Sequence, residues 1–355
     1  MTRQAALAPA ESFYSSDGWL ELLEGHGHEH RYLLLGEADR AVLAPVTDGE
    51  AVESGRYRPG FLLADRVEAD RCLLAGPLSG YRNELRSGTG RPPAGEVAHG
   101  LLAAAAGRTV LLPYLPTVTA AGFEAAGYPG AVIAWDAWLD VPDAGFDEYL
   151  ARLPRGHREQ VKGDLRRIKR AGITFDAMPL QEPFRDLAEL LVQHERKYDP
   201  GYRQPSERFA HYLARCAGLP GAHVILARRD GRVVGCHVVF HYTGVLWARL
   251  IGVDESSLDT RGCYFGLMFY ETVKLGHRLG AGTVHLGIGT SEAKARRGAV
   301  LEPLWTVALT EDTEAGGLVQ QGLLVRSRDL PDPLPPGAAP PPAVPSEALR
   351  PERSA

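Results

Sequence analysis

Two stretches of the chain consist of apolar runs separated by short polar turns, the pattern of β-hairpins. Residues 30–46 read as an apolar run, a charged turn and a second apolar run, and residues 222–242 repeat this plan with an Asp-Gly pair at the turn. Each stretch is followed by another apolar segment, at 61–65 and at 245–253. The pattern is typical of one α/β fold used twice, although hairpins are common enough for the two to be unrelated.

The segment between these stretches has the periodicity of an amphipathic helix. From Val161, apolar residues recur at i, i+4 and i+7. Pro154 interrupts the preceding helical pattern, so we expect this helix to begin near Arg155, and an Ala-Gly pair at 171–172 predicts its end. We expect further helices at 183–198, 205–216 and 262–279, and strands at 223–228, 233–242, 245–253, 283–288 and 304–310. The second half therefore predicts an α/β domain with a largely antiparallel sheet.

The length of 355 residues exceeds the size at which one hydrophobic core usually divides, so we expect two domains. We place the first domain at 1–145 and the second at 146–315. The stretch from Pro331 is rich in proline and poor in large apolar residues. We therefore expect residues 316–355 to be a disordered tail, because such a composition buries too little surface to fold.

Composition and charge narrow the class of protein. The net charge of -5 is small for this length and does not indicate a nucleic-acid or membrane partner. The four cysteines lie far apart without a C-x-x-C pair, as in proteins of reducing compartments. The N-terminus shows no apolar signal segment, and no apolar run is long enough to span a membrane. We expect a soluble cytoplasmic protein.

The predicted helix at 155–170 is strongly basic. It holds seven Lys and Arg against two acidic residues, a net charge of +5 in a chain that totals -5. Arg158, Lys162 and Arg166 follow one another at four-residue spacing on one face, where like charges cost about 0.2–0.5 kcal/mol per pair. Two interpretations stay open: a solvated helix face, or a surface for the phosphates of a substrate or of RNA.

A second candidate for phosphate binding is the turn Arg261-Gly262-Cys263-Tyr264-Phe265-Gly266, which follows the strand at 245–253 and opens a helix. Free backbone N–H groups at such a helix start can bind a pyrophosphate. The turn and its surroundings resemble the GNAT acyltransferase fold, in which an R-G-x-G-x-G/A turn binds coenzyme A. Tyr264 stands where that motif has its middle glycine.

The resemblance is closer to the FemAB-like and BioF2-like branch of the GNAT superfamily, over roughly 15–315. It is carried by YLARLPRGHREQVKGDLRRIKRAGI at 149–173, by CYFGLMFYETVKLGHRLGAGTVHLGIGTSEAKARRG at 263–298 and by CLLAGPLSGY at 72–81. The resemblance implies tandem GNAT-like domains, an α/β (α+β) fold with mostly antiparallel mixed sheets.

The same resemblance implies an acyltransferase that forms an amide bond between an activated carboxyl donor and a small-molecule or peptide amine. The donor is acyl-CoA or aminoacyl-tRNA, so tRNA is a possible partner in a FemX-type reaction. An alternative of another class is a non-catalytic module that binds a phosphate ligand or RNA on the same scaffold.

Amide formation needs a base for the amine and donors for the oxyanion. We predict Glu292, His285 and Lys294 as catalytic residues. We assign substrate binding to Arg249, Tyr264, His237 and His241, and donor phosphates to Arg261, Gly262, Gly266, Arg158, Lys162 and Arg166. The alternative is a structural role for each histidine and an exposed ion pair for Glu292.

Two other groups receive structural interpretations. Arg296 and Arg297 are interpreted as charges on the rim of the site. His26, His28 and His30 are read as a polar loop, because metal sites usually add Cys or carboxylate ligands at turn-forming spacing. We predict no metal ion.

Overall fold

The computed structural model describes residues 7–24, 30–36, 38–88, 92–256 and 260–330. Its strands in the first half are β1 (Arg31–Leu35), β2 (Val42–Asp48), β3 (Cys72–Ala75), β4 (Arg86–Ser87), β5 (Thr109–Pro116) and β6 (Gly130–Asp140). Those of the second half are β7 (Thr174–Pro179), β8 (Ala222–Arg229), β9 (Arg232–Tyr242), β10 (Val245–Val253), β11 (Thr283–Gly287) and β12 (Val300–Leu309). They join in one sheet of order β1-β2-β3-β5-β12-β6-β11-β10-β9-β8-β7, with β4 beside β2.

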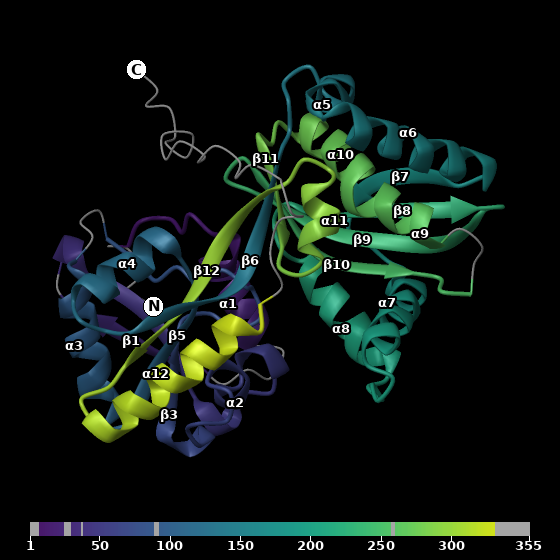
Figure 1. The fold of residues 1–355 in the computed structure, drawn as a ribbon. Coiled ribbons are helices and arrows are strands. Elements are labelled where there is room, and N and C mark those ends of the chain that lie inside the picture. Colours follow the sequence, from purple (N-terminus) through teal and green to yellow (C-terminus); the bar gives the residue numbers. More distant parts are fainter. Residues whose placement is uncertain (1–6, 25–29, 37, 89–91, 257–259, 331–355) are drawn as a thin grey trace.

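The sheet is built from one arrangement used twice. In each half a strand pairs in parallel with the strand that follows a long helical connection, β3 with β5 and β10 with β11, while the other pairs are antiparallel. The last strand of each half crosses over: β6 pairs with β11, β12 pairs with β5, and β6 and β12 pair with each other. Figure 1 shows these two long strands joining the halves. The prediction of a repeated α/β fold with a mostly antiparallel sheet is confirmed.

Helices cover both faces of the sheet in each half (Figure 1). On the first half they are α2 (Pro59–Leu62), α3 (Ala94–Ala105), α4 (Thr117–Ala125) and the C-terminal α12 (Thr313–Arg328), while the N-terminal α1 (Asp17–Glu24) packs on the second half. In the second they are α5 (Phe146–Arg152), α6 (Arg155–Arg170), α7 (Phe184–Tyr198), α8 (Ser206–Ala217), α9 (Thr260–Phe265), α10 (Thr272–Leu279) and α11 (Ser291–Ala295). A π-helical segment, Gly266–Glu271, joins α9 to α10.

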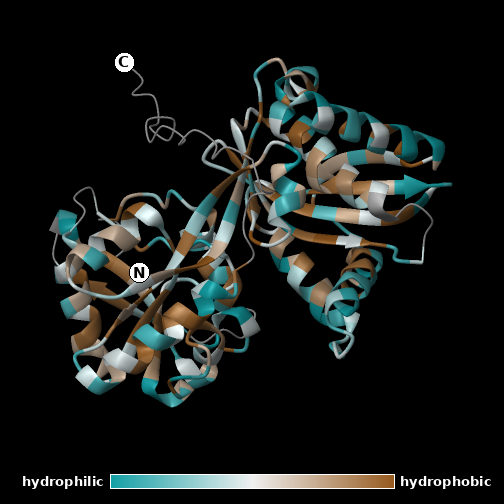
Figure 2. Cartoon of the chain, in the orientation of Figure 1, coloured by the Kyte–Doolittle hydropathy of each residue, from teal (hydrophilic) through white to brown (hydrophobic). Residues whose placement is uncertain are grey.

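Apolar side chains fill four cores, one on each face of each half. In the second half, α5, α6, α9 and α10 pack on one face, and α1, α7 and α8 pack on the other. In the first half, α3 and α4 cover one face and α2 and α12 cover the other. Figure 2 accordingly shows hydrophobic residues along the strands and hydrophilic residues on the outer side of α6.

The basic helix forms where the sequence predicts it. Helix α6 begins at Arg155 directly after Pro154 and ends at Arg170. Gly172 follows with a φ of +66°, the left-handed conformation that glycine commonly adopts just after a helix. Val161 and Ile168 are buried on its inner face.

The boundary of the predicted tail is wrong, because the helix α12 continues through Arg328. The Asp312 side chain caps this helix by accepting hydrogen bonds from the N–H groups of Glu314 and Ala315, and Val319 and Leu323 are buried against the first half. Residues 300–328, assigned to the second domain and the tail, thus pack with the first half. The Pro-rich stretch from Pro331 lies outside the described residues. None of the helices in the described ranges is long and apolar enough to cross a membrane.

Candidate active site

Strands β10 and β11 separate near the middle of the sheet. They pair in parallel from Val245–Thr283 to Trp247–His285, and the pairing stops there although β10 continues to Val253. A register shift at Arg249 against β9 and another after His285 against β6 mark bulges in both strands. Because a bulge bends its strand and adds an unpaired residue, the two strands diverge beyond Trp247.

The corresponding strands of the first half also separate, but a side chain joins them there. Pairing of β3 with β5 ends at Leu74–Leu111. Beyond it the buried Asn83 donates from its side-chain amide to the Ala75 carbonyl at 2.8 Å, and its backbone N–H donates to the Tyr114 carbonyl at 2.9 Å. This makes the divergence of β10 and β11 the candidate site.

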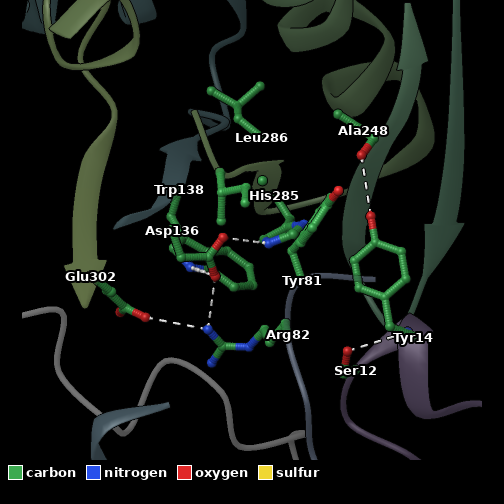
Figure 3. A network of polar contacts seen from close by, with 12 residues as sticks. Ser12, Tyr14, Tyr81, Arg82, Asp136, Trp138, Ala248, His285, Leu286 and Glu302 are labelled. Carbon is green, nitrogen blue, oxygen red and sulfur yellow. Dashed lines mark hydrogen bonds and ion pairs between the residues drawn. The ribbon is translucent and has the colours of Figure 1, made fainter. Parts of the chain in front are cut away.

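His285 lies at the divergence and is held by a buried carboxylate from the exchanged strand β6. Its Nε2 atom is 2.7 Å from Oδ1 of Asp136, and both side chains are fully buried (Figure 3). An ionised carboxylate only accepts hydrogen bonds, so Nε2 carries the proton. Nδ1 has no hydrogen-bond partner among the described residues. The arrangement is therefore an oriented imidazole with a free nitrogen, as a general base requires.

Asp136 stays ionised because three donors surround it. Besides His285, it accepts from Nη1 of Arg82 at 3.0 Å and from Nε1 of Trp138 at 3.1 Å (Figure 3). Burial alone raises the pKa of this carboxyl, but His285 and Arg82 outweigh burial and hold the pKa below its usual value. Asp136 thus fixes both the orientation and the tautomer of His285.

Aromatic rings and further carboxylates complete the surroundings of His285. Its ring lies 4.7 Å from the rings of Trp138 and Trp247 and 5.7 Å from that of Tyr14, centroid to centroid. Arg82 also meets two other carboxylates, Glu84 at 3.0 Å and Glu302 at 3.5 Å. Three carboxylates around one guanidinium give the neighbourhood a net negative charge, which favours a cationic ligand such as an alkylammonium.

Lys294 and Glu292 form no hydrogen bond with His285 in the described part of the chain, although Lys294 feels the charge of Asp136. The buried ammonium of Lys294 donates to three carbonyls, those of Leu286 and Gly287 at 2.8 Å and of Ile288 at 2.9 Å. Burial lowers the pKa of Lys294 to about 7, whereas three acceptors favour the form with three N–H donors. Its donors order the loop after β11. Glu292 is 62% exposed and pairs with Arg296 at 2.5 Å, one helical turn along.

The two histidines of β9 also lie apart from His285. The Nδ1 atom of His237 is 3.2 Å from the Leu267 carbonyl and 3.0 Å from Oγ1 of Thr272, and burial lowers its pKa to about 4. His237 thus ties β9 to the π-helical segment. His241 is partly buried near His223, and burial lowers its pKa.

The start of α9 lies against the C-terminal part of α6. A Cβ atom on Gly262 would be 3.5 Å from Ile168 and 4.0 Å from Arg167, and one on Gly266 would be 2.4 Å from the ring of Phe175. Gly266 is thus required for packing. Tyr264 is half-buried, and burial raises its pKa to about 12. The side chain of Arg261 lies outside the described part of the chain.

The basic stripe of α6 divides into an inner and an outer part. Arg158 donates to the carbonyls of Ala151 and Leu153, both at 2.9 Å, and so caps α5. Lys162 is exposed and pairs with Glu159 at 3.1 Å, and Arg166 is exposed.

Arg297 is not a rim charge. Its side chain is 1% exposed, and its Nη2 atom donates to Oδ2 of Asp164 at 2.8 Å. The guanidinium lies 3.5 Å from the ring centroid of Phe265, and Nε donates to the Tyr270 hydroxyl at 3.2 Å. Arg297 thereby joins the loop after α11 to α6.

Three residues of the site were missed by sequence reasoning. Asp136, Arg82 and Tyr14 come from the first half, far from His285 in the chain, and no motif marks them. Only Asp136 gives a signal, as an acid in the interior of an apolar strand sequence, GAVIAWDAWLD, whose second acid is the terminal Asp140. As for metals, no group of three His, Cys, Asp or Glu side chains that could hold an ion occurs in the described ranges, and His26 and His28 lie outside them.

Comparison with known proteins identifies the class. Residues 155–295 match the family described as acetyltransferase (GNAT) domain. The matched residues include α6 and the diverging strands β10 and β11.

Solved structures extend the likeness to both halves. The crystal structure of FemX is similar at a TM-score of 0.59 and 12% identity, covering 87% of this chain and 95% of that one. The C-terminal domain (DUF2156) of a putative lysylphosphatidylglycerol synthetase from Agrobacterium fabrum is similar at 0.57 and 12%, covering 86% and 90%. L-PGS from Bacillus licheniformis is similar at 0.52 and 14%, covering 88% and 97%. At these identities the likeness is one of fold. No curated protein matches the chain in sequence.

The two findings together confirm the resemblance to FemAB-like GNAT acyltransferases. The GNAT match rests on sequence and the FemX likeness on fold. The match over 155–295 supports a transferase, whereas the likeness to FemX is one of fold.

Proposed function

We propose that this protein forms an amide bond between an activated carboxyl donor and an amine acceptor, with His285 as the general base. The observation that carries the proposal is the buried His285–Asp136 pair at the divergence of β10 and β11, with Nδ1 free. The negative surroundings of Arg82 and its three carboxylates support an amine as the acceptor.

In the proposed reaction the acceptor ammonium first loses one proton to solvent, because a protonated nitrogen has no lone pair. The neutral amine nitrogen then attacks the donor carbonyl and the new C–N bond forms. Nδ1 of His285 takes the proton that the amine loses, and Asp136 stabilises the resulting imidazolium. The bond between the carbonyl carbon and the leaving oxygen or sulfur then breaks, and the leaving group takes up one proton. Backbone N–H groups of β10 beyond Trp247 that lack a strand partner are candidates for holding the oxyanion, at about 10²–10³ in rate each.

The donor is acyl-CoA or an aminoacyl-tRNA. A GNAT domain supports a thioester of coenzyme A, and the similarity to the FemX fold supports a charged tRNA. The exposed cations of α6, including Lys162 and Arg166, lie on the helix that packs against the start of α9. In either case this surface would contact donor phosphates.

A non-catalytic module that binds a phosphate ligand or RNA is the second candidate. The exposed basic face of α6 favours it, as does the exposed ion pair that Glu292 forms with Arg296.

Mass spectrometry of the product tests the proposal. The protein is incubated with amine mixtures and either acyl-CoAs or charged tRNA, alongside the variants His285→Gln and His223→Gln. His223 is a partly buried histidine of β8 whose Nδ1 lies 2.9 Å from the carbonyl oxygen of Gly221, and it serves as the matched control. Amide product from one donor, lost in His285→Gln alone, supports the proposal. Donor binding without product from any mixture supports the binding module.

A further inference from the structure

Arg249 is a cation without a carboxylate partner, and it lies on the bulge of β10. Its Nε donates to the Tyr212 hydroxyl at 3.2 Å. The guanidinium lies 5.1 Å from the ring centroid of Trp19 and 5.9 Å from that of Tyr212. Within the described part of the chain no carboxylate pairs with it, and its two Nη atoms have no protein acceptor.

Within the described ranges the most buried arginines are paired, whereas Arg249 is partly buried, like Arg158 and Arg326, which also meet no carboxylate. Arg82 meets Asp136, Arg86 meets Asp17, and Arg297 meets Asp164. A cation beside two aromatic rings and without a carboxylate partner can offer its remaining N–H groups to an anionic ligand. Glu195 on α7 feels the charge of Arg249 but forms no ion pair with it, and burial raises the pKa of that carboxyl. The two Nη groups of the Arg249 guanidinium, its fork, are thus free to bind a ligand.

The open fork lies close to the proposed base. Trp247 precedes Arg249 by two residues on β10 and pairs with His285 across to β11. Trp247 thus links the two residues. The spacing of alternate residues along a strand, combined with the spacing between adjacent strands, places the Cα atoms of Arg249 and His285 roughly 8 Å apart. Tyr14 spans the same distance: its ring contacts His285, and its hydroxyl donates to the Ala248 carbonyl at 3.3 Å (Figure 3).

We propose that Arg249 binds a carboxylate of the acceptor, so that the acceptor is an amino acid or a short peptide with a free carboxylate. The assignment of the amine end to His285 rests on the proposed function. A small zwitterion matches the charges of the site, with its ammonium toward the carboxylates around Arg82 and its carboxylate on Arg249.

A carboxylate fits this position better than a phosphate. The planar guanidinium fork matches a carboxylate in two parallel hydrogen bonds. A phosphate monoester carries nearly two negative charges, whereas Arg249 supplies one positive charge and Glu195 lies nearby. The flanking rings of Trp19 and Tyr212 also suit a flat group.

Calorimetry with paired probes tests the proposal without any donor. Each of L-lysine, L-phenylalanine and L-leucine is compared with the amine that lacks its carboxylate: cadaverine, phenethylamine and isopentylamine. We expect one amino acid or more to bind the wild-type protein about 10- to 100-fold more tightly than its amine. In Arg249→Met this preference disappears, and the melting temperature equals or exceeds that of the wild type, because an unpaired charge is removed.

Three results would overturn the proposal: equal binding within every pair, no amino acid binding at millimolar concentration, or an unchanged preference in Arg249→Met. Should that variant fail to fold, Arg249→Lys takes its place, since it keeps the charge and loses the fork. A preference at least fivefold below the wild-type value is then expected, and an unchanged one contradicts the proposal.

The outcome is separate from that of the proposed function. Transfer to amines without a carboxylate as fast as to amino acids leaves the transferase standing and removes the role of Arg249. Carboxylate-dependent binding without transfer does the reverse.

Discussion

Replacing Arg297 by methionine should destabilise the protein strongly, because it leaves a buried carboxylate unpaired. The side chains of Arg297 and Asp164 are 1% and 6% exposed, and 2.8 Å separates their nearest polar atoms. Removing one partner of such a pair typically costs about 3–5 kcal/mol. For a domain of this size the loss corresponds to a fall of roughly 6–20 °C in melting temperature. Calorimetric or circular-dichroism melting measures it directly.

Two further variants isolate the cause. Arg296→Met changes the neighbouring arginine, which is exposed and pairs with Glu292, and should stay within about 0.5 kcal/mol of the wild type. Asp164→Leu combined with Arg297→Met should cost less than the sum of the two single changes, by about 2 kcal/mol. A loss below about 1 kcal/mol for Arg297→Met, or additive losses, would refute the reasoning.

Two other predictions concern Lys294 and α6. Burial lowers the pKa of Lys294 from 10.5 to about 7, so between these pH values the unfolded chain binds more protons than the folded protein. The free energy of unfolding therefore falls as the pH drops to 7 and rises as the pH increases toward 10.5. Between pH 7 and 9 the free energy of unfolding of the wild type should therefore rise relative to Lys294→Met, by up to about 1.4 kcal/mol per pH unit; a constant difference would mean that the three carbonyls keep the ammonium charged. On α6, the double variant Arg166→Glu with Arg170→Glu should bind the acyl donor more weakly and with a smaller dependence on salt. The double variant Arg31→Glu with Arg71→Glu changes the charge equally at a distant place and should bind the donor as the wild type does. Equal weakening by both pairs contradicts a specific role for α6.

Much of the fold is legible in the sequence because it depends on local patterns. The start of α6 at Arg155 and its end before Gly172 follow from a proline, a glycine and helical periodicity. The hairpin of β8 and β9 follows from an Asp-Gly turn between apolar runs. The exchange of β6 and β12 between the halves has no local signal, because strand partners distant in the chain are chosen by the packing of the whole sheet.

The candidate site also combines features with a local sequence signal and features without one. His285 could be proposed from its place in a strand before a glycine loop. Its partner Asp136 is 149 residues away and reaches it only through the strand exchange. Local charge also misleads: Arg296 and Arg297 are adjacent, yet one is exposed and the other buried, since successive residues of a turn face different sides. Lys294 is a further example, because its side-chain N–H groups donate to backbone carbonyls and the local sequence does not indicate this.

The central claim is that His285, oriented by Asp136, takes the proton of the attacking amine. The most direct measurement is kcat/KM for amide formation by wild type, His285→Gln and His223→Gln with the donor that gives product. The account predicts a loss of about 10²–10⁴ in His285→Gln, with unchanged donor binding and unchanged activity in His223→Gln. Activity of His285→Gln within about threefold of the wild type would contradict it.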